Sequence, residues 1–362
     1  MNLKPPLLLV LLVFLCVFGL FLRGSLYGFD GYASAAAVKY GWFDTLPHQP
    51  LANLVFSVLP DSLIVYKLLM FLCLFCTILP IFLCIKKKYS EKEAFLAVFL
   101  LLALSPILLF GFGELENEIF AYPLIAWGLY FVFNRKYWLS IPFFLFSLGF
   151  WLWPGYLVSN FNLFSPGPSL EQQRFSGVIN VWLLLPFVFF IPLFKDIRLR
   201  VFGLASFFLW IWNTKLFLFF LFFVALAIPN ALKRFDEWLK THENWLFSRN
   251  NLMVLAVFCC VGVNVAYIIQ LPTPNHLNLI KTTVSMSEDL NIPISNDWAF
   301  GYWFWYYGYK SAYTPGAQDT LKLKQYIAQS LPYLYLTRYD QNCSLLKSDY
   351  INDKNLNLYL CS

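Results

Sequence analysis

The sequence predicts a polytopic α-helical membrane protein with a small α/β domain at its C-terminal end. Of its 362 residues, 59% are hydrophobic and 13% are charged, whereas soluble domains are roughly 45–50% apolar and about 25% charged. The 40 phenylalanines are spread along the chain, as expected of lipid-facing helices, and long apolar runs recur. This composition excludes a soluble globule and a disordered chain, and it argues against a nucleic-acid-binding protein.

The apolar runs predict about nine membrane spans. The first run follows Lys4, and no small-x-small cleavage site comes after it, so we expect an uncleaved span rather than a signal peptide. The runs cover residues 5–22, 63–85, 94–110, 119–133, 138–152, 178–194, 201–212, 216–229 and 252–270.

Lysines and arginines are distributed unevenly between the loops. Clusters follow alternate runs, at Lys86–Lys88, Arg135–Lys136, Lys195/Arg198/Arg200 and Lys233/Arg234/Lys240. The opposite loops hold only Arg23, Lys39, Arg174 and Lys215. Cation-rich loops stay in the cytoplasm, so we expect the N-terminus inside, the C-terminal domain outside, and a location in the plasma membrane. The net charge of +6 then reflects topology rather than an acidic partner.

One join in this topology has two interpretations. Residues 201–229 form either two short spans broken at Asn213–Lys215 or one long tilted helix, which would move the C-terminal domain to the cytoplasm. A lysine in mid-membrane is costly, so we favour the broken hairpin.

The composition changes at Leu271, which divides the chain into a transmembrane domain (1–270) and an extracytoplasmic domain (271–362). Prolines and mixed charges appear there. The alternating runs Tyr333–Leu336 and Leu356–Leu360 predict strands. Cys343 and Cys361 lie in this polar stretch, where they can pair if it is extracytoplasmic.

Acidic residues are scarce, which makes their positions informative. Asp30 follows the first span, and Glu114, Glu116 and Glu118 lie between two apolar runs. Clustered carboxylates at a membrane boundary repel one another unless protons or a cation compensate, and a divalent metal suits oxygen ligands. On a continuous helix Glu114 and Glu118 would share a face; in a loop that opens the fourth span, Glu116 and Glu118 would converge. The simpler alternatives are a helix-capping Asp30 and a solvated glutamate loop.

Several segments, in order, resemble the catalytic subunit of oligosaccharyltransferases, which belong to the GT-C class of membrane glycosyltransferases. The acid-bearing positions are Asp30, after the first span, and Gly113–Glu118, which contains an acid-Asn-acid motif at the start of the fourth span. Ala103–Pro106 ends the third span, and Trp153–Leu157 is similar to a family segment at the outer end of a span. Asn296–Trp303 resembles the family's Trp-Trp-Asp-Tyr-Gly signature.

The resemblance implies a GT-C-like fold and a reaction. A glycan would move from a polyprenyl-(pyro)phosphate donor to a protein or peptide acceptor, at an Asn side chain, on the extracytoplasmic face. A divalent metal, Mn²⁺ or Mg²⁺, would be held by Asp30, Glu116 and Glu118, and Asp30 would also be catalytic by acting on the acceptor nucleophile. Trp298, Phe300 and Gly301 would contribute to acceptor binding.

The chain differs from the family pattern, as a short, divergent member would. It has fewer expected spans than most members, and Ala299 stands where the signature has Asp. An alanine side chain cannot accept a hydrogen bond from the Ser or Thr hydroxyl of an Asn-x-Ser/Thr acceptor. Asp297 and Phe300 replace the first Trp and the Tyr of the signature. Glu171 is a partial counterpart of a further outer-loop motif that ends in Glu, or an exposed loop acid.

Two other functional classes remain open: a secondary transporter and a catalytically inactive membrane scaffold. A transporter usually has internal repeats, and none is evident here. The aromatic run 298–309 is also typical of a membrane interface irrespective of function. His48, His242 and His276 have no metal-ligand spacing.

Overall fold

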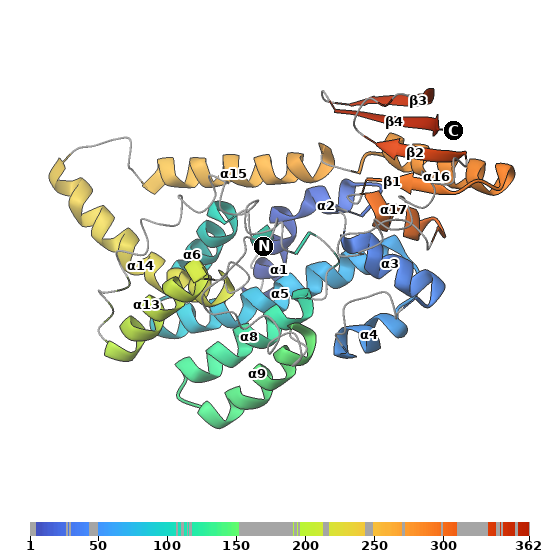
Figure 1. Ribbon diagram of the computed structural model, residues 1–362. Helices are drawn as coiled ribbons and strands as arrows, with labels where there is room; N and C mark the ends of the chain where they lie inside the picture. The colour runs from blue at the N-terminus through green and yellow to red at the C-terminus, as the bar shows by residue number, and fades with distance from the viewer. Residues whose placement is uncertain are drawn as a thin grey trace.

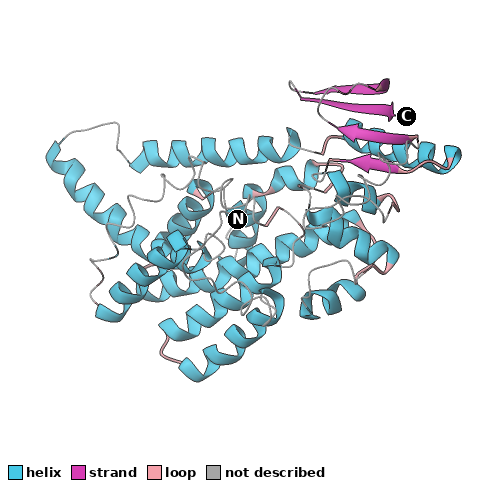
Figure 2. Cartoon of the chain, in the orientation of Figure 1, coloured by secondary structure: helices cyan, strands magenta, loops and turns pink. Residues whose placement is uncertain are grey.

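The chain is mostly helical, with one small sheet confined to its C-terminal part (Figures 1 and 2). The structure, a computed structural model, describes residues 5–26, 28, 30–42, 50–105, 108–109, 112–113, 115, 118–151, 191, 194, 196–212, 217–242, 249–269, 272–297, 300–309, 332–337, 341, 343–351 and 354–361.

The helices of the N-terminal part are α1 (Pro5–Cys16), α2 (Phe18–Leu22), α3 (Asp30–Tyr40), α4 (Pro50–Ser57), α5 (Leu63–Lys88), α6 (Glu91–Leu104), α8 (Glu118–Phe133) and α9 (Tyr137–Trp151). Those that follow are α13 (Ile197–Trp212), α14 (Phe217–His242), α15 (Arg249–Ile269), α16 (Pro274–Leu290) and α17 (Gly301–Tyr306).

Three described helical stretches are long and apolar enough to cross a membrane: Leu63–Lys88, Leu218–Glu237 and Asn251–Leu290. The third stretch extends over two helices, α15 and α16, and the side chain of Thr273 caps the start of α16. Three shorter apolar helices cover Pro5–Cys16, Ile119–Phe133 and Tyr137–Phe150. The expected helical architecture with a small C-terminal sheet is confirmed, and the three long apolar helices are consistent with a membrane protein; nine spans and a GT-C fold stay predictions.

The first predicted span is divided into two helices, α1 and α2, at Val17, whose φ and ψ are −123° and 16°. Immediately after this break α2 packs closely on α15. A Cβ added at Gly19 would lie 2.2 Å from the carbonyl oxygen of Asn264, and the Gly19 amide donates to the Asn264 side chain. Small residues allow such close helix contacts in membranes.

Helix α5 connects the two ends of the bundle. Its 26 residues span about 39 Å at 1.5 Å per residue, close to the thickness of a bilayer with its headgroups. Near its start, Lys67 is buried and donates to the carbonyl of Arg23. At its end, the Lys87 ammonium donates to Asn134 in the turn between α8 and α9, and Lys88 lies 4.6 Å from the ring centroid of Phe194. Three of the expected cation clusters therefore meet at one end of the bundle.

Residues 201–229 are not one helix. Helices α13 and α14 are separate and pack against each other, with the rings of Phe207 and Phe220 5.7 Å apart. The broken hairpin predicted from Asn213–Lys215 is therefore the arrangement found, although Asn213–Lys215 themselves lie outside the described residues.

Several helices expose wide apolar faces, as lipid contact requires. Phe258 is 70% exposed on α15, and Val254, Val261 and Ile269 are also exposed on that helix. Such contiguous apolar surface is rare on a soluble monomer, so it supports a membrane setting for the bundle.

The C-terminal part contains a four-stranded sheet of β1 (Ile294–Asn296), β2 (Tyr333–Thr337), β3 (Ser344–Ile351) and β4 (Lys354–Cys361). The strand order is β1-β2-β4-β3; β1 and β2 are parallel and the other pairs antiparallel. Helix α16 contacts all four strands. Both alternating runs form strands, β2 and β4, as predicted.

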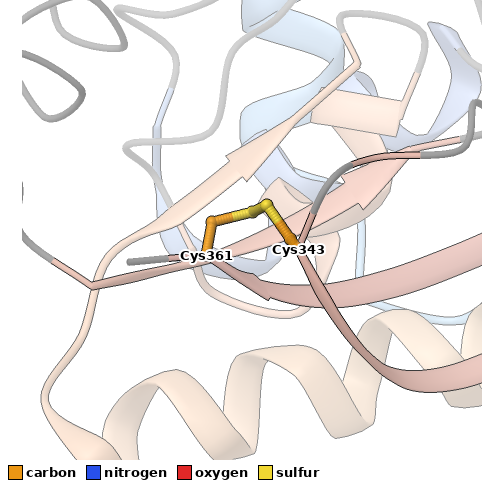
Figure 3. The surroundings of a disulfide bond; sticks show 2 residues. All are labelled: Cys343 and Cys361. Carbon is orange, nitrogen blue, oxygen red and sulfur yellow. A yellow bond between two sulfur atoms is a disulfide. The ribbon is translucent and has the colours of Figure 1, made fainter.

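The two cysteines of the polar stretch are joined. Cys343 and Cys361 form a disulfide whose closed loop ends on β4 (Figure 3). The pairing that the sequence permitted is therefore present, and the six other cysteines are free.

Candidate functional site

The first acidic segment, residues 28–32, leads into α3. Gly28 has a φ of +76°, a conformation that favours glycine, and the chain turns there. Helix α3 begins at Asp30. The structure describes the backbone of Asp30 but not its side chain. Tyr32 on the first turn is buried and its hydroxyl donates to the carbonyl of Leu26, 3.3 Å away. Burial raises the pKa of Tyr32, so this hydroxyl keeps the proton that it donates.

The second acidic segment, residues 113–118, leads into α8, which begins at Glu118. Leu115 lies outside any helix, so Glu114 and Glu118 do not share a continuous helix. This argues against the helical Glu114/Glu118 pair, while convergence of Glu116 and Glu118 in a loop stays a prediction. Glu114, Glu116 and the Glu118 side chain lie outside the described residues.

The two acidic segments touch through their backbones. A Cβ added at Gly31 would lie 3.0 Å from the backbone nitrogen of Leu115 and 3.4 Å from its Cβ. Gly31 follows Asp30 directly, and Leu115 precedes Glu116. Two segments more than 80 residues apart in sequence are therefore adjacent, at the point where both carry acids.

Apolar residues in and beside the second acidic segment are buried. Phe112, Leu115 and Ile119 are each at most 1% exposed. Phe112 packs edge to face on Tyr122 of α8, with the ring centroids 5.2 Å apart. The apolar side chains around the glutamates are therefore packed into the bundle; whether the glutamates themselves are solvated lies outside the described residues.

Asp30 and Glu118 share one local property: each is the first residue of a helix. The backbone amides of a helix N-terminus favour negative charge, by about 0.3–1 kcal/mol at exposed positions. This is also what the capping interpretation of Asp30 predicts, so the position of Asp30 alone does not separate a cap from a ligand.

A third segment, the aromatic segment of residues 300–306, lies against α3. The buried Trp303 indole donates to the carbonyl of Gly28, 3.4 Å away. Tyr32 packs edge to face on Tyr306, with centroids 5.2 Å apart. The Tyr40 hydroxyl donates to the carbonyl of Tyr306, at 3.2 Å. Figure 1 shows α17 beside α3 at the end of the bundle that carries the sheet.

His276 supports Trp303 from the other side. Its ring stacks on the indole at an angle of 26°, with the centroids 6.2 Å apart. It also completes a capping box with Thr273 at the start of α16. His276 is thus fixed by its own helix and holds the tryptophan that reaches Gly28.

Arg23 ties the end of α2 to the beginning of the C-terminal part. The side chain is buried and donates to three carbonyls: Leu26 at 3.0 Å, Tyr267 at 2.7 Å, and Pro272. A buried charge is tolerated when its donors are satisfied. The first acidic segment, five residues later, therefore starts from a fixed point.

Asp297 is engaged by the sheet. Its carboxylate accepts hydrogen bonds from the Thr337 hydroxyl at 3.1 Å and the Tyr335 hydroxyl at 3.3 Å. Burial, reinforced by the charge of Asp297, raises the pKa of Tyr335. These contacts direct the carboxylate toward β2.

The remaining predicted site residues fall into two groups. Trp298, Ala299 and Glu171 lie outside the described residues. Phe300 is 2% exposed and packs on Trp303, with the centroids 5.3 Å apart, and Gly301 is buried at the start of α17. Their acceptor-binding role stays a prediction; the visible role of both residues is to hold the segment against α3.

The described side chains do not include those of the predicted metal ligands. Among the residues whose side chains are described, no three His, Cys, Asp or Glu side chains form a group able to hold a metal. Because the side chains of Asp30, Glu116 and Glu118 are outside that set, the predicted metal site stays a prediction.

Sequence reasoning identified the acidic segments but missed Gly31, Trp303, Arg23 and His276. A weak signal existed for two of them: Arg23 is one of few cations on its side of the bundle, and the run Thr273–His276 has the pattern of a helix start with proline at the first position. Neither pattern reveals a long-range partner.

Comparison of the sequence with protein-family models and with curated proteins finds no match.

Proposed function

We propose that this protein is a membrane glycosyltransferase that moves a glycan from a polyprenyl-(pyro)phosphate donor to an acceptor, a protein or peptide Asn in the first instance. The proposal includes a GT-C-like arrangement of about nine spans. The observation that carries it is the backbone contact between Gly31 and Leu115, which puts Asp30 next to the segment of Glu116 and Glu118.

The aromatic segment adds to this support. Two adjacent acidic loops on their own would not distinguish this function from those of many other membrane proteins. Here a third segment, separated from them by most of the chain, reaches the first acidic segment through the Trp303–Gly28 hydrogen bond. All three segments of the proposed site are among those that carry the family resemblance.

The donor set fits a divalent metal. Asp30, Glu116 and Glu118 offer only carboxylate oxygens, the ligands that Mn²⁺ and Mg²⁺ prefer, and the Gly31–Leu115 contact brings their segments together. When bound, such a metal supplies positive charge that stabilises the negative charge developing on the phosphate leaving group.

The chain's own residues have separate tasks in this proposal. Asp30 orients the acceptor nucleophile and accepts its proton. The negative charges of Glu116 and Glu118 balance the positive charge of the metal ion. Trp303 and Tyr32 pack behind Asp30, exclude water from that side and fix the start of α3.

Two further observations support an extracytoplasmic site. The Cys343–Cys361 disulfide is typical of an oxidising compartment. Lys87, Lys88 and the α8–α9 turn gather at the other end of α5 from the Arg23–Lys67 contact, and cation-rich ends stay in the cytoplasm. Both support a plasma-membrane protein whose C-terminal domain faces outward.

We expect the enzyme to recognise the Ser or Thr hydroxyl of the acceptor peptide only weakly. The carboxylate of Asp297 already accepts from Tyr335 and Thr337, so it is a poor substitute for the acid that Ala299 replaces. We therefore propose that the enzyme does not require the Ser or Thr hydroxyl of an Asn-x-Ser/Thr peptide.

The test is transfer by purified protein. The protein is incubated with a polyprenyl-linked glycan and a fluorescent Asn-containing peptide, with Mn²⁺, with Mg²⁺ or with a chelator. Metal-dependent glycopeptide formation is the expected result. Ion or solute flux in proteoliposomes without glycopeptide would instead identify a transporter, and neither activity would leave an inactive scaffold.

A further inference from the structure

A cleft opens at the cation-rich end of the bundle, far from the acidic segments. It lies between the end of α8, the start of α9 and the N-terminal half of α13, with α14 beneath, and it encloses about 450 Å³, including its open mouth. Its floor is apolar and buried: Leu129, Phe222 and Phe223 are each at most 7% exposed.

The rim of the cleft is polar and carries excess positive charge. Arg135 and Arg198 line it together with Tyr137 and Asp196. The Arg198 guanidinium donates to the Tyr137 hydroxyl at 3.3 Å, so the two side chains form one edge. The Asp196 carboxylate accepts a hydrogen bond from the Arg198 backbone amide at 2.9 Å and so caps α13. Asp196 is the one acid among the described lining residues, and its carboxylate is therefore already engaged.

Arg135 occupies a position where glycine is usual. Its φ is +60°, and the amides of Arg135 and Lys136 donate to the carbonyls of Val132 and Phe131, at 3.0 and 2.8 Å. This is the Schellman arrangement that ends many helices. A side chain in this left-handed conformation costs roughly 1–2 kcal/mol. The cation lies at the C-terminal end of α8, which partly offsets that cost, and its position at the mouth suggests a ligand.

The surroundings of the mouth are those of a lipid-facing surface. Trp138 is 86% exposed on α9, and Phe208 is 65% exposed on α13. Leu139 and Val201, nearer the rim, are also exposed. A soluble anion would not need apolar surface on both sides of its site, whereas a lipid whose phosphate meets the rim would place its chains there.

We propose that this cleft binds the headgroup of one anionic glycerophospholipid, with its phosphate between Arg135 and Arg198 and its acyl chains against the exposed apolar side chains beside the mouth, among them Leu139 and Val201. Guanidinium groups hold phosphate through several charge-assisted hydrogen bonds. A zwitterionic choline lipid binds less well because its cation meets the same arginines. This site is separate from the proposed transfer site and does not depend on it.

The test is lipid titration of the purified full chain in detergent, read by native mass spectrometry. Phosphatidylglycerol and phosphatidylcholine with the same acyl chains are compared. We expect phosphatidylglycerol to bind at least about tenfold more tightly, and R135Q/R198Q to lose about tenfold of that affinity, as removal of charged hydrogen bonds implies. The matched control is K233Q/R234Q, which removes the same charge from exposed positions of α14 outside the cleft lining; it should keep the wild-type preference.

A second variant separates binding from folding. R135G suits the left-handed backbone, so its unfolding temperature should equal or exceed that of the wild type, while its affinity for phosphatidylglycerol falls. R135K/R198K keeps the charge and should retain part of the preference.

Four results would overturn the proposal. They are equal binding of the two lipids, an equal loss in K233Q/R234Q, full binding by R135Q/R198Q, and displacement of the lipid by millimolar inorganic phosphate as effectively as by unlabelled phosphatidylglycerol. The last result would assign the cleft to a soluble anion.

Discussion

Replacing Gly31 by alanine tests the contact on which the proposed site depends. The added methyl would lie 3.0 Å from the backbone nitrogen of Leu115, about 0.4 Å closer than ordinary van der Waals contact allows. Neither backbone can yield as a flexible side chain does, so the two acidic segments must separate by a few tenths of an ångström.

The expected cost in stability is small because two effects oppose each other. Overpacking costs about 1–3 kcal/mol, whereas alanine in a helix is favoured over glycine by roughly 0.5–1 kcal/mol, and Gly31 is the second residue of α3. The net destabilisation is therefore about 0–2 kcal/mol. Catalysis is more sensitive: if 1 Å of misplacement costs about 100-fold, then about 0.4 Å costs about fivefold.

The assay compares Gly31→Ala with Gly24→Ala for Mn²⁺ affinity, transfer rate and unfolding midpoint. Gly24 belongs to the same connection between α2 and α3, and an added Cβ there meets nothing within 4 Å. Gly31→Ala should lose metal affinity and rate while Gly24→Ala keeps both. If the two variants behave alike, the Gly31–Leu115 contact does not position the acids.

Three further predictions concern the site and its orientation. Glu116→Gln should lower metal affinity and transfer at least about tenfold, as loss of a charged ligand implies, while Glu114→Gln changes little; equal losses in calorimetric and transfer assays would contradict the loop arrangement. After reduction, Cys343 and Cys361 should react with a membrane-impermeant thiol reagent in intact cells, and labelling only after lysis would place the site on the cytoplasmic face. In competition between paired peptides, wild type should prefer Asn-x-Thr by about 1 kcal/mol or less, and Ala299→Asp should increase that preference; a strict threonine requirement in wild type would show that another group reads the hydroxyl.

Features that depend on local sequence could be predicted. The alternating runs 333–336 and 356–360 predicted strands, and both stretches form strands. The polar triplet Asn213–Lys215 predicted a break between two helices, because a lysine in mid-membrane is costly. The structure has two separate helices there, α13 and α14. The start of α8 at Glu118 also followed from the position of the acids before an apolar run.

Features that depend on distant partners could not be predicted. The Gly31–Leu115 contact depends on how α3 meets the loop before α8, and a glycine in the first turn of a helix has no sequence signal that identifies its distant neighbour. Trp303 was included in the segment that resembles the family signature, with an interfacial aromatic run as the alternative, but nothing in that segment points to Gly28 or His276 as its partners. The break of the first span at Val17 was missed for the same reason, since close packing on α15 accompanies it.

The Arg23 contacts have a consequence for biosynthesis. The arginine is synthesised well before its partner Pro272, which lies 249 residues further along the chain. At about 5–20 residues per second, that interval lasts on the order of 10–50 s. During this time the first span is already in the membrane, but the carbonyls of Tyr267 and Pro272 have not yet been made. The Arg23 guanidinium must therefore stay at the hydrated surface. The nascent chain therefore holds its first helix in a provisional position, and the arrival of α15 draws Arg23 inward and sets the final depth of that helix.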